Sequence, residues 1–354
     1  MTVRRRWLLG LVGATTAAAG VAHYAGVPAV PAFVLAAAAL AGLAWVVSFA
    51  TEQVGERFGP AATGVLQSTL GNLPEFFVVL FALSQGEVIV AQFSLIGSIF
   101  ANALLVLGAV IVVGATTSAD GYMRFHARLP NDTATLLLLA SFIIVLVGLS
   151  HGTHDTASAH IETISAIAAA LLLSVYAVWV VAYVRSGSAA ERESSGERRA
   201  APGTSLATSI ALLAAAGVGA AFVSDWFIAA LRPTIDALGV SDEFAGLVIV
   251  AIAGNAVENT TGVVLAAKQQ SDLAISVVKN SVAQIAAFLY PALVLVSLLF
   301  AHHLTFGIPL LYVGALFLTA ISIWQITTDG TASAFEGWAL VATYGVLAVF
   351  TLYE

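Results

Sequence analysis

The sequence predicts an all-α integral membrane protein of about eleven transmembrane helices, with one N-terminal helix followed by two inverted five-helix repeats. Three observations predict this fold. Of the 354 residues, 60% are hydrophobic and only 9% are charged, whereas about a quarter of the residues in a soluble domain are charged. Eleven windows are long and apolar enough to cross a bilayer. One polar motif also occurs twice, once in each half of the chain.

Composition excludes several other classes of protein. The chain has no cysteine, so disulfides, thiolate metal sites and cysteine nucleophiles are excluded. The net charge of −7 says little about partners, because most of the surface is expected to face lipid. The sequence contains no basic patch with interleaved aromatic residues, so we do not expect a nucleic-acid ligand. No Ser/His or paired-Asp arrangement has a spacing suited to hydrolysis, so we do not expect an enzyme.

The apolar windows set the expected spans, since about 20 mostly apolar residues cross the hydrocarbon core. The polar breaks are shortest at Ser84–Glu87 and at Lys268–Asp272. The expected spans cover residues 7–25, 29–51, 60–84, 88–114, 133–150, 161–184, 205–231, 244–267, 272–299, 304–325 and 334–353.

A basic cluster, Arg4 to Arg6, precedes the first apolar run, which continues to Ala25. We expect a first membrane helix with a cytoplasmic basic anchor. The same pattern also fits a signal peptide that is removed, in which case the mature chain begins beyond Ala25.

Basic residues set the expected orientation, because cytoplasmic loops carry an excess of Lys and Arg. With the N-terminus inside, 11 of the 13 Lys and Arg residues fall inside. Arg232 falls outside and Lys279 lies within a span. We therefore expect a multi-pass protein of the cell membrane, with a cytoplasmic N-terminus and Glu354 outside.

The longest polar segment, residues 185–204, is rich in Glu, Arg, Ser and Gly. It cannot bury apolar area, so it predicts a flexible cytoplasmic linker. It separates a first five-helix repeat (28–184) from a second (205–354), and residues 1–27 form the N-terminal helix. Because five is odd, the second repeat must enter the membrane with the opposite orientation to the first.

The repeated motif places one carboxylate in each repeat. It reads Gly-Asn-Leu-Pro-Glu at Gly71–Glu75 and Gly-Asn-Ala-Val-Glu at Gly254–Glu258, and adding 183 to the first set of numbers gives the second. A carboxylate inside a membrane span is costly and marks an ion or proton pathway. In transporters built from inverted repeats, the substrate site forms near the midplane, where the repeats meet. We therefore predict that Glu75 and Glu258 bind cations and protons.

Further oxygen atoms accompany the two carboxylates. The Asn and Glu of each motif, Asn72 with Glu75 and Asn255 with Glu258, are three residues apart and share a helix face. Backbone carbonyls and helix kinks are expected to contribute at four positions, namely Gly71, Gly254, Leu70 and Pro74. Proline has no N–H for the carbonyl four residues earlier, so a kink and a free acceptor are expected, and glycine lets backbone oxygens face the site. Such a set suits a hard cation such as Ca²⁺, which takes six to eight oxygen ligands.

The spans after each motif carry a polar stripe at four-residue spacing. The two stripes are Ser94, Ser98 and Asn102, and Ser276, Asn280 and Gln284. We expect Gln92 and Gln284 to bind the cation or to support its ligands, together with Ser98 and Ser281. For the serines, hydrogen bonding between helices is an equal alternative. Asn102 and Asn280 are candidate gate or modulator residues.

Two carboxylates close together in a low-dielectric site repel each other, so at least one tends to hold a proton. A divalent cation supplies the missing charge. Cations and protons therefore compete for the same oxygens, which is sufficient for exchange when the site opens to alternate sides of the membrane.

Other charged residues support weaker hypotheses. Glu52 and Asp225 occupy mirrored positions near span ends and are either waypoints at the two mouths of the pathway or ordinary interfacial charges. Lys279 is a candidate modulator, and it also allows a structural alternative in which it pairs with Glu258. The segment from His151 to Glu162 resembles a metal-collecting cluster, but a solvated loop is the better interpretation. His302 and His303 are expected in a loop.

The two halves resemble the α-repeats of the Ca²⁺/H⁺ exchangers, a family of the Ca²⁺/cation antiporter superfamily. The matching stretches are Ser48–Glu52, Gly71–Glu75 and Gln92–Gly108 in the first half, and Gly254–Glu258, Asp272–Ile275 and Ser281–Ala286 in the second. The resemblance implies eleven membrane helices and cation binding by Glu75 and Glu258. It also implies supporting ligands, namely Asn72, Asn255, Gln92, Ser98, Ser281 and Gln284.

The chain departs from the family pattern at a few positions. Asn259 stands where the family commonly has His, and Asn280-Ser281-Val282 stands where it has Gly-Ser-Ser, preceded by Lys279. We predict Ca²⁺/H⁺ exchange by alternating access. The alternative is Na⁺/H⁺ or K⁺/H⁺ exchange at the same site. A channel is the hypothesis from a different functional class of membrane protein. The expected partners are inorganic cations, protons and the lipid bilayer. No cofactor is expected, and a homo-oligomer is left open.

Overall fold

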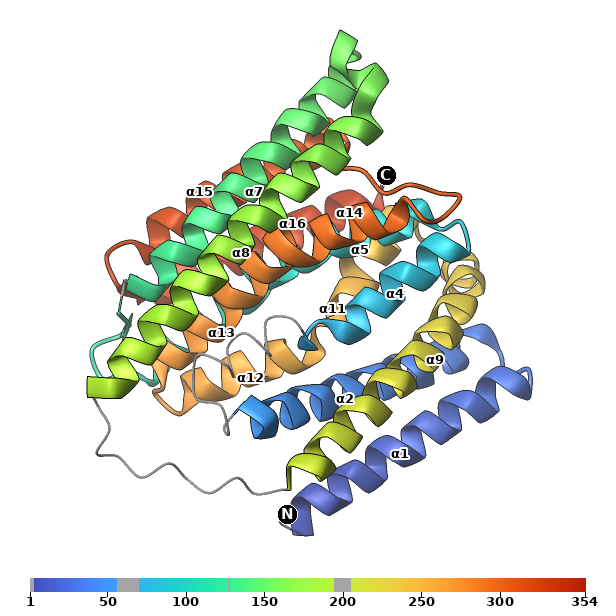
Figure 1. The fold of residues 1–354 in the computed structure, drawn as a ribbon, viewed down its shortest axis with the longest axis horizontal. Coiled ribbons are helices and arrows are strands. Elements are labelled where there is room, and N and C mark those ends of the chain that lie inside the picture. The colour runs from blue at the N-terminus through green and yellow to red at the C-terminus, as the bar shows by residue number, and fades with distance from the viewer. Residues whose placement is uncertain (1–2, 56–69, 127, 194–204) are drawn as a thin grey trace. The chain divides into compact units, whose positions relative to one another are not determined.

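A computed structural model of the chain describes residues 3–55, 70–126, 128–193 and 205–354. Almost all of the regular structure in these ranges is helical, as Figure 1 shows. The elements are α1 (Val3–Tyr24), α2 (Ala29–Gly55), α4 (Leu73–Ser84), α5 (Val88–Phe100), the π-helix η1 (Ala101–Val106), α6 (Leu107–Thr117), β1 (Tyr122–Arg124), α7 (Arg128–Thr153), the 3₁₀ helix η2 (Thr156–His160), α8 (Ile161–Glu193), α9 (Leu206–Leu238), α10 (Asp242–Phe244), the π-helix η3 (Ala245–Val250), α11 (Ala251–Gly254), α12 (Ala256–Ala267), α13 (Ser271–Gln284), the π-helix η4 (Ile285–Leu289), α14 (Tyr290–Ser297), α15 (Leu310–Thr327), β2 (Thr331–Ser333) and α16 (Ala334–Leu352).

The helices confirm a multi-pass membrane protein. In the described residues, eight helical stretches are long and apolar enough to cross a membrane, or nine if the bent pair Asp242–Gly254 and Asn259–Ala267 is one span. Helix α1 forms where predicted but is not among the eight. The first ten residues of the third expected span, 60–69, lie outside the described residues, and α4 forms most of the rest. The count of eleven spans therefore stays a prediction.

One expected span begins later than its hydropathy predicts. Helix α15 begins at Leu310 instead of residue 304, because the segment before it is an irregular, partly buried loop. In this loop the N–H groups of Leu304 and Phe306 donate to the hydroxyls of Ser297 and Ser165. The side chains of Leu304 and Phe306 are buried. Apolar residues that pack a loop are thus indistinguishable by composition from those of a span.

The helix before the expected linker is also longer than predicted. Helix α8 continues to Glu193, nine residues into the segment 185–204. The added residues include Ala189-Ala190-Glu191-Arg192-Glu193, which are good helix formers. The rest of the expected linker, residues 194–204, lies outside the described residues.

The chain divides into two compact units that do not follow the sequence repeats. The first unit comprises Met1–Phe81 and Ser174–Gly239, and the second comprises Ala82–Leu173 and Val240–Glu354. Each unit therefore contains helices from both halves of the chain.

In the first unit, α1, α2 and α9 lie side by side (Figure 1). The rings of Phe33 and Phe227 join α2 to α9 with a centroid distance of 4.6 Å. Gly20 of α1 lies against Trp226 of α9, where an added Cβ would be 2.9 Å from the indole ring. Small residues on α1 thus permit the three helices to approach each other.

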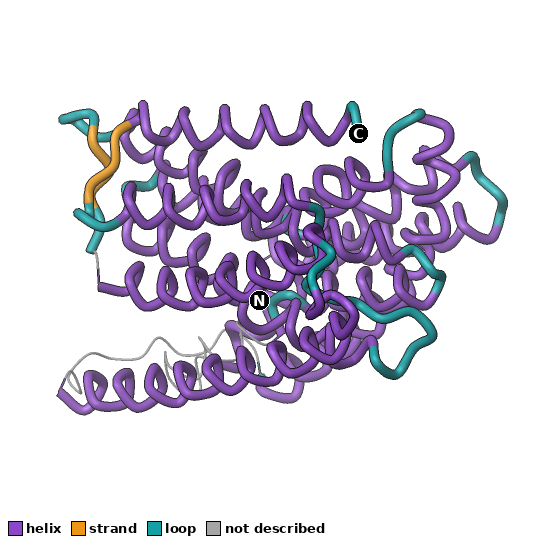
Figure 2. The backbone as a smooth tube through the Cα atoms, turned by 90° about the horizontal axis from the view of Figure 1, so that it is seen from above, coloured by secondary structure: helices purple, strands orange, loops and turns teal. Residues whose placement is uncertain are grey.

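In the second unit, the two most buried spans are Val88–Thr117 and Ser271–Ser297. Helices α7, α15 and α16 pack around them. A two-stranded antiparallel sheet, seen in orange in Figure 2, pairs Tyr122 with Ser333 and Arg124 with Thr331. The sheet links the end of α6 to the start of α16. Strands of three residues carry too little pattern to be predicted from sequence.

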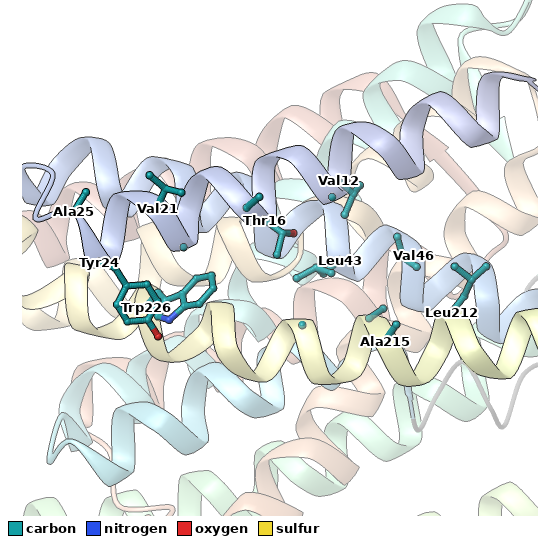
Figure 3. A pocket seen from close by; sticks show the side chains of 15 residues that line it. Val12, Thr16, Val21, Tyr24, Ala25, Leu43, Val46, Leu212, Ala215 and Trp226 are labelled. Atoms are coloured by element: carbon teal, nitrogen blue, oxygen red, sulfur yellow. The ribbon is translucent and has the colours of Figure 1, made fainter.

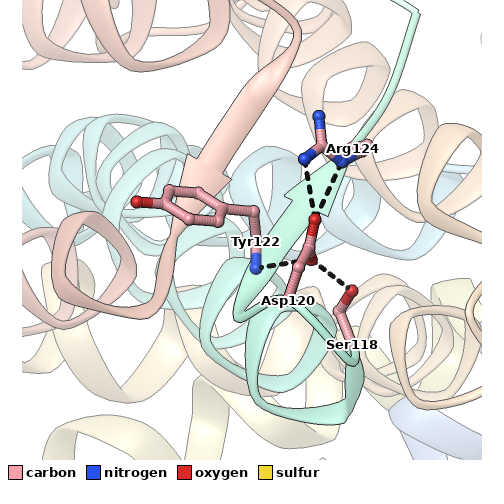
Figure 4. A network of polar contacts seen from close by, with 4 residues as sticks. All are labelled: Ser118, Asp120, Tyr122 and Arg124. Carbon is pink, nitrogen blue, oxygen red and sulfur yellow. Dashed lines mark hydrogen bonds and ion pairs between the residues drawn. The ribbon is translucent and has the colours of Figure 1, made fainter.

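An acidic turn connects α6 to the sheet (Figure 4). Asp120 accepts hydrogen bonds from the Ser118 hydroxyl, the Tyr122 N–H and the Arg124 guanidinium, the last at 2.7 Å. Chiefly because Arg124 donates to it, the pKa of Asp120 falls to about 2. These contacts therefore favour the ionised form of Asp120.

Helix α5 crosses η3 at a contact that only glycine permits. A Cβ added to Gly97 would lie 2.4 Å from the Cα of Leu247, and one added to Gly246 would lie 2.9 Å from the carbonyl oxygen of Val90. Two backbones can approach this closely only where side chains are missing. The crossing brings the polar stripe of α5 to the second repeat.

Replacement of Gly97 by valine is expected to lower the stability of the protein by at least about 1–3 kcal/mol, because the side chain would overpack a backbone contact. The measurement is the thermal unfolding midpoint of the detergent-purified protein. The matched control is Gly314→Val on α15, where an added Cβ meets nothing within 4 Å. Equal midpoints for the two variants would contradict the crossing described above.

Candidate functional site

Both repeated motifs mark a break in a helix. In the second repeat α11 ends at Gly254, Asn255 is not helical, and α12 begins at Ala256. The helical segments on the two sides of this break are bent by 56°. A break of this kind inside a span leaves carbonyls at the end of the first segment without helical partners. Such carbonyls are suited to a cation.

In the first repeat the break precedes the proline, which corrects the predicted kink. Gly71 and Asn72 form a turn after Leu70, and α4 begins at Leu73. Pro74 therefore lies in the first turn of α4, where a missing N–H costs nothing. The second motif breaks without a proline, so the Gly-Asn pair is the feature that the two breaks share.

Asn255 is the centre of a buried hydrogen-bond network in the second unit. Its Nδ2 donates to the Ser98 hydroxyl at 2.8 Å and to the Ala251 carbonyl at 2.9 Å. Its Oδ1 accepts from the Nδ2 of Asn102 at 3.0 Å. The side chains of Ser98, Asn102 and Asn255 are each at most 1% exposed. The network thus joins three of the predicted residues, two from the first repeat and one from the second.

Among the predicted site residues that the structure describes, two buried oxygen atoms lack hydrogen-bond partners. Within the described part of the chain, the Oδ1 of Asn102 and the hydroxyl of Ser281 are buried and have no hydrogen-bond partner. Buried polar atoms of this kind are costly unless something pairs with them. A bound cation would pair with an amide oxygen such as that of Asn102 and with a hydroxyl oxygen such as that of Ser281. This favours a direct ligand role for Asn102, which the sequence predicts only as a gate or modulator.

Irregular helix turns lie next to the polar residues in both repeats. The π-helix η1 begins three residues after Ser98, and η4 begins four residues after Ser281. A third π-helix, η3, ends at Val250, four residues before Gly254. Single π turns inside α-helices occur frequently at functional sites. Their positions therefore agree with the predicted site.

Of the two motif glutamates, the structure describes the side chain of Glu75 but not that of Glu258. Glu75 lies in the first turn of α4 and is 4% exposed, and Asn72 before it is also buried. Glu258 lies on α12, but its side chain is outside the described residues. The convergence of the two carboxylates therefore stays a prediction.

The remaining stripe residues lie near the end of α13. Gln284 is the last residue of that helix and is half-buried, as is Asn280. Gln92 has a different environment. Its amide nitrogen donates to the carbonyls of Thr305 and Gly307 at 2.9 and 3.0 Å. Through these bonds Gln92 holds the loop that precedes α15.

Lys279 is buried on α13, with 4% of its surface exposed. Its Nζ donates to the Thr327 hydroxyl on α15 at 2.6 Å. Sequence reasoning missed Thr327, because a single threonine at a helix end carries no pattern. The structural alternative, in which Lys279 pairs with Glu258, is not tested, because the side chain of Glu258 lies outside the described residues. Glu52 and Asp225, the expected waypoints, lie on α2 and α9, exposed and half-buried respectively.

The segment from His151 to Glu162, expected as a solvated loop, is instead mostly helical, since it comprises the end of α7, the 3₁₀ helix η2 and the start of α8. Among the described residues, no group of three His, Asp or Glu side chains is arranged to hold a metal ion. His303 lies in the irregular loop before α15 and pairs with Glu162 at 3.0 Å. Asp155 accepts from the Ser150 hydroxyl and from the N–H groups of η2, and the Ser150 bond is the main cause that lowers its pKa.

Comparisons with known proteins agree over most of the chain. The family model described as sodium/calcium exchanger protein matches residues 28–185 and 208–353. The Ca²⁺/H⁺ antiporter of Synechocystis sp. is 30% identical over 347 residues, covering 93% of this chain and 92% of that protein. The vacuolar calcium ion transporter of Schizosaccharomyces pombe is 31% identical over 332 residues, covering 91% and 79%.

Solved structures share the fold. The structure of native YfkE gives a TM-score of 0.82 at 25% identity and covers 98% of this chain and all of that one. The H⁺/Ca²⁺ exchanger CAX gives a TM-score of 0.73 at 14% identity, covering 99% of this chain and 93% of that one.

Replacement of Asn102 by leucine is expected to destabilise the protein by about 1–3 kcal/mol, because the Asn255 Oδ1 loses its donor while buried. The thermal unfolding midpoint of the purified protein measures the change. The matched control is Ser94→Ala, since the Ser94 hydroxyl bonds only to the Ala91 carbonyl of its own helix. A midpoint for Asn102→Leu no lower than that of the control would contradict this role of the network.

Proposed function

The chain belongs to the family of sodium/calcium exchanger proteins, and from this premise we propose that it is a secondary active antiporter that exchanges Ca²⁺ for H⁺. The observation that carries the proposal is the buried network of Ser98, Asn102 and Asn255 at the break between α11 and α12. It brings polar oxygens of both repeats together at membrane depth. Relatives bearing the names Ca²⁺/H⁺ antiporter and vacuolar calcium ion transporter support the choice of ions.

The proposed site consists of two carboxylates and neutral oxygens. Glu75 and Glu258 bind the cation or protons, and the neutral oxygens come from Asn72, Asn255, Asn102, Ser98 and Ser281. Burial of Glu75 supports this role, because a charged side chain at the centre of a bilayer costs about 2.5–3.5 kcal/mol on insertion scales. Protons and Ca²⁺ neutralise the same carboxylates, so binding of one displaces the other.

Exchange proceeds by alternating access, with the site opening to one side of the membrane at a time. The opposite orientation that the sequence predicts for the two repeats supports this mechanism, since inverted repeats can exchange conformations about a central site. The protein lies in the cell membrane with its N-terminus in the cytoplasm, as the distribution of Lys and Arg favours.

Na⁺/H⁺ or K⁺/H⁺ exchange is the second candidate function. Burial of Lys279, two residues before Ser281, favours it. A fixed ammonium group on α13, the helix that carries Ser281, opposes a divalent cation more strongly than a monovalent one.

Replacement of either glutamate, as Glu75→Gln or Glu258→Gln, is expected to reduce pH-gradient-driven Ca²⁺ uptake into proteoliposomes to the level of empty vesicles. Each glutamine removes a negative charge that Ca²⁺ binding requires, and it removes the carboxylate that protons must occupy during exchange. The matched control is Glu162→Gln, an exposed carboxylate that pairs with His303. Retained uptake in either site variant would overturn the site assignment.

The same proteoliposomes distinguish the ions. Under an imposed pH gradient, the unsubstituted protein is expected to move Ca²⁺ and not Na⁺ or K⁺. Flux of Na⁺ or K⁺ without Ca²⁺ flux would reject the leading proposal in favour of the second.

Replacement of Lys279 by methionine is expected to lower the half-saturating Ca²⁺ concentration severalfold, since it removes a positive charge near the site while keeping the volume. The control Thr327→Val keeps the charge and removes only the hydrogen bond. Initial rates of Ca²⁺ uptake measure both variants. An unchanged or raised half-saturating concentration for Lys279→Met would contradict an electrostatic role for this lysine.

A further inference from the structure

A groove of about 860 Å³ lies within the first unit, between α1 and α9, with α2 beneath it (Figure 3). Small residues open it, namely Gly13 and Ala17 on α1 and Ala215 and Gly219 on α9. Leu43 of α2 lies between the two helices. The polar atoms among the lining side chains belong only to Thr16, Tyr24 and Trp226.

The groove runs along two membrane spans. Helices α2 and α9 are both long and apolar enough to cross a bilayer, so the space between them and α1 lies at the depth of hydrocarbon. An empty groove would forfeit the dispersion contacts of its lining. Something apolar must therefore occupy it in the membrane.

The length of the groove suits an extended acyl chain. From Val12 to Ala25 the groove follows α1 for about 20 Å at 1.5 Å per residue, which is the length scale of such a chain.

The two ends of the groove differ in charge. At one end Trp226 stacks on His23 with a centroid distance of 5.9 Å and meets Tyr24 edge-on at 6.0 Å. The other end, at Val12, faces the start of α1, where Arg5 and Arg6 lie about 9–10 Å further along the helix and outside the groove lining. Arg5 is positioned by a cation–π contact, 4.8 Å above the Phe49 ring of α2. Arg6 is exposed.

We propose that this groove binds an acyl chain of an anionic phospholipid, with the phosphate at Arg5 and Arg6. The chain lies against Gly13, Ala17 and Leu43 and ends at Trp226. Hydrophobicity alone cannot select this lipid, because lipid tails are as apolar as the groove. Selection comes from the arginines, each of which contributes about a fivefold preference for an anionic headgroup.

Trp226 provides a direct probe, because an acyl chain in the groove must contact it. The experiment uses the full chain with Trp226 as its only tryptophan, the other five being replaced by phenylalanine. The protein is reconstituted in phosphatidylcholine with increasing fractions of phosphatidylglycerol brominated on its acyl chains. Quenching at Trp226 is expected to be half-maximal at a mole fraction at least about tenfold lower than for a protein that keeps only Trp338, which is 60% exposed on α16.

Two sets of variants separate the groove from the headgroup site. Gly13→Phe fills the groove and is expected to abolish the preferential quenching of Trp226. Its control is Gly10→Phe, since an added Cβ meets nothing within 4 Å at either glycine and Gly10 does not line the groove. Arg5→Gln with Arg6→Gln is expected to remove the preference while leaving the groove open. Quenching of Trp338 in each background shows that the protein is folded in the bilayer.

Other outcomes would overturn the proposal. Identical quenching curves for Trp226 and Trp338 would mean that the groove only meets bulk lipid. Equal quenching by brominated phosphatidylcholine would remove the role of the arginines. No quenching of Trp226 at any fraction, together with energy transfer between separately labelled chains, would assign the groove to a second copy of this chain.

Discussion

Much of this structure depends on one constraint: inside a bilayer, polar groups must find partners within the protein, since no water is available to them. Asn255 meets this constraint through its side-chain amide, which forms hydrogen bonds to Ser98, to Asn102 and to the Ala251 carbonyl. The amide fixes the end of one broken helix against a helix from the other repeat. The side-chain oxygen of Asn102 is then held in place and available to a cation.

Close backbone contact makes this network possible. Gly97 and Gly246 allow α5 to cross η3 where any side chain would collide, and the crossing brings Ser98 and Asn102 to Asn255. Each of the two spans also contains a π turn, which begins a few residues after Ser98 and after Ser281. In lipid, packing of this kind replaces the hydrophobic effect as the force that joins helices. Glycine positions are therefore as important to the site as the polar residues.

Small residues serve a second purpose on α1 and α9. There they open a groove that the protein's own side chains leave unfilled, and the basic start of α1 gives that groove a charged end. Both features follow from the same physics, because a glycine on a membrane helix either admits another backbone or leaves room for lipid. Which of the two occurs depends on whether a neighbouring helix crosses at that point.

The sequence by itself determined the all-α membrane fold, the repeated Gly-Asn-x-x-Glu motif and the stripe that contains Ser98 and Asn102, because burial in lipid restricts composition and spacing strongly. The tertiary structure decided other features: the helix break before Pro74, the loop at 298–309 and the bonds of Gln92 and Lys279 to Thr305, Gly307 and Thr327. Each of these depends on contacts between residues far apart in the chain. Hydropathy and helical period report only on a residue's immediate neighbours, so they carry no information about such partners.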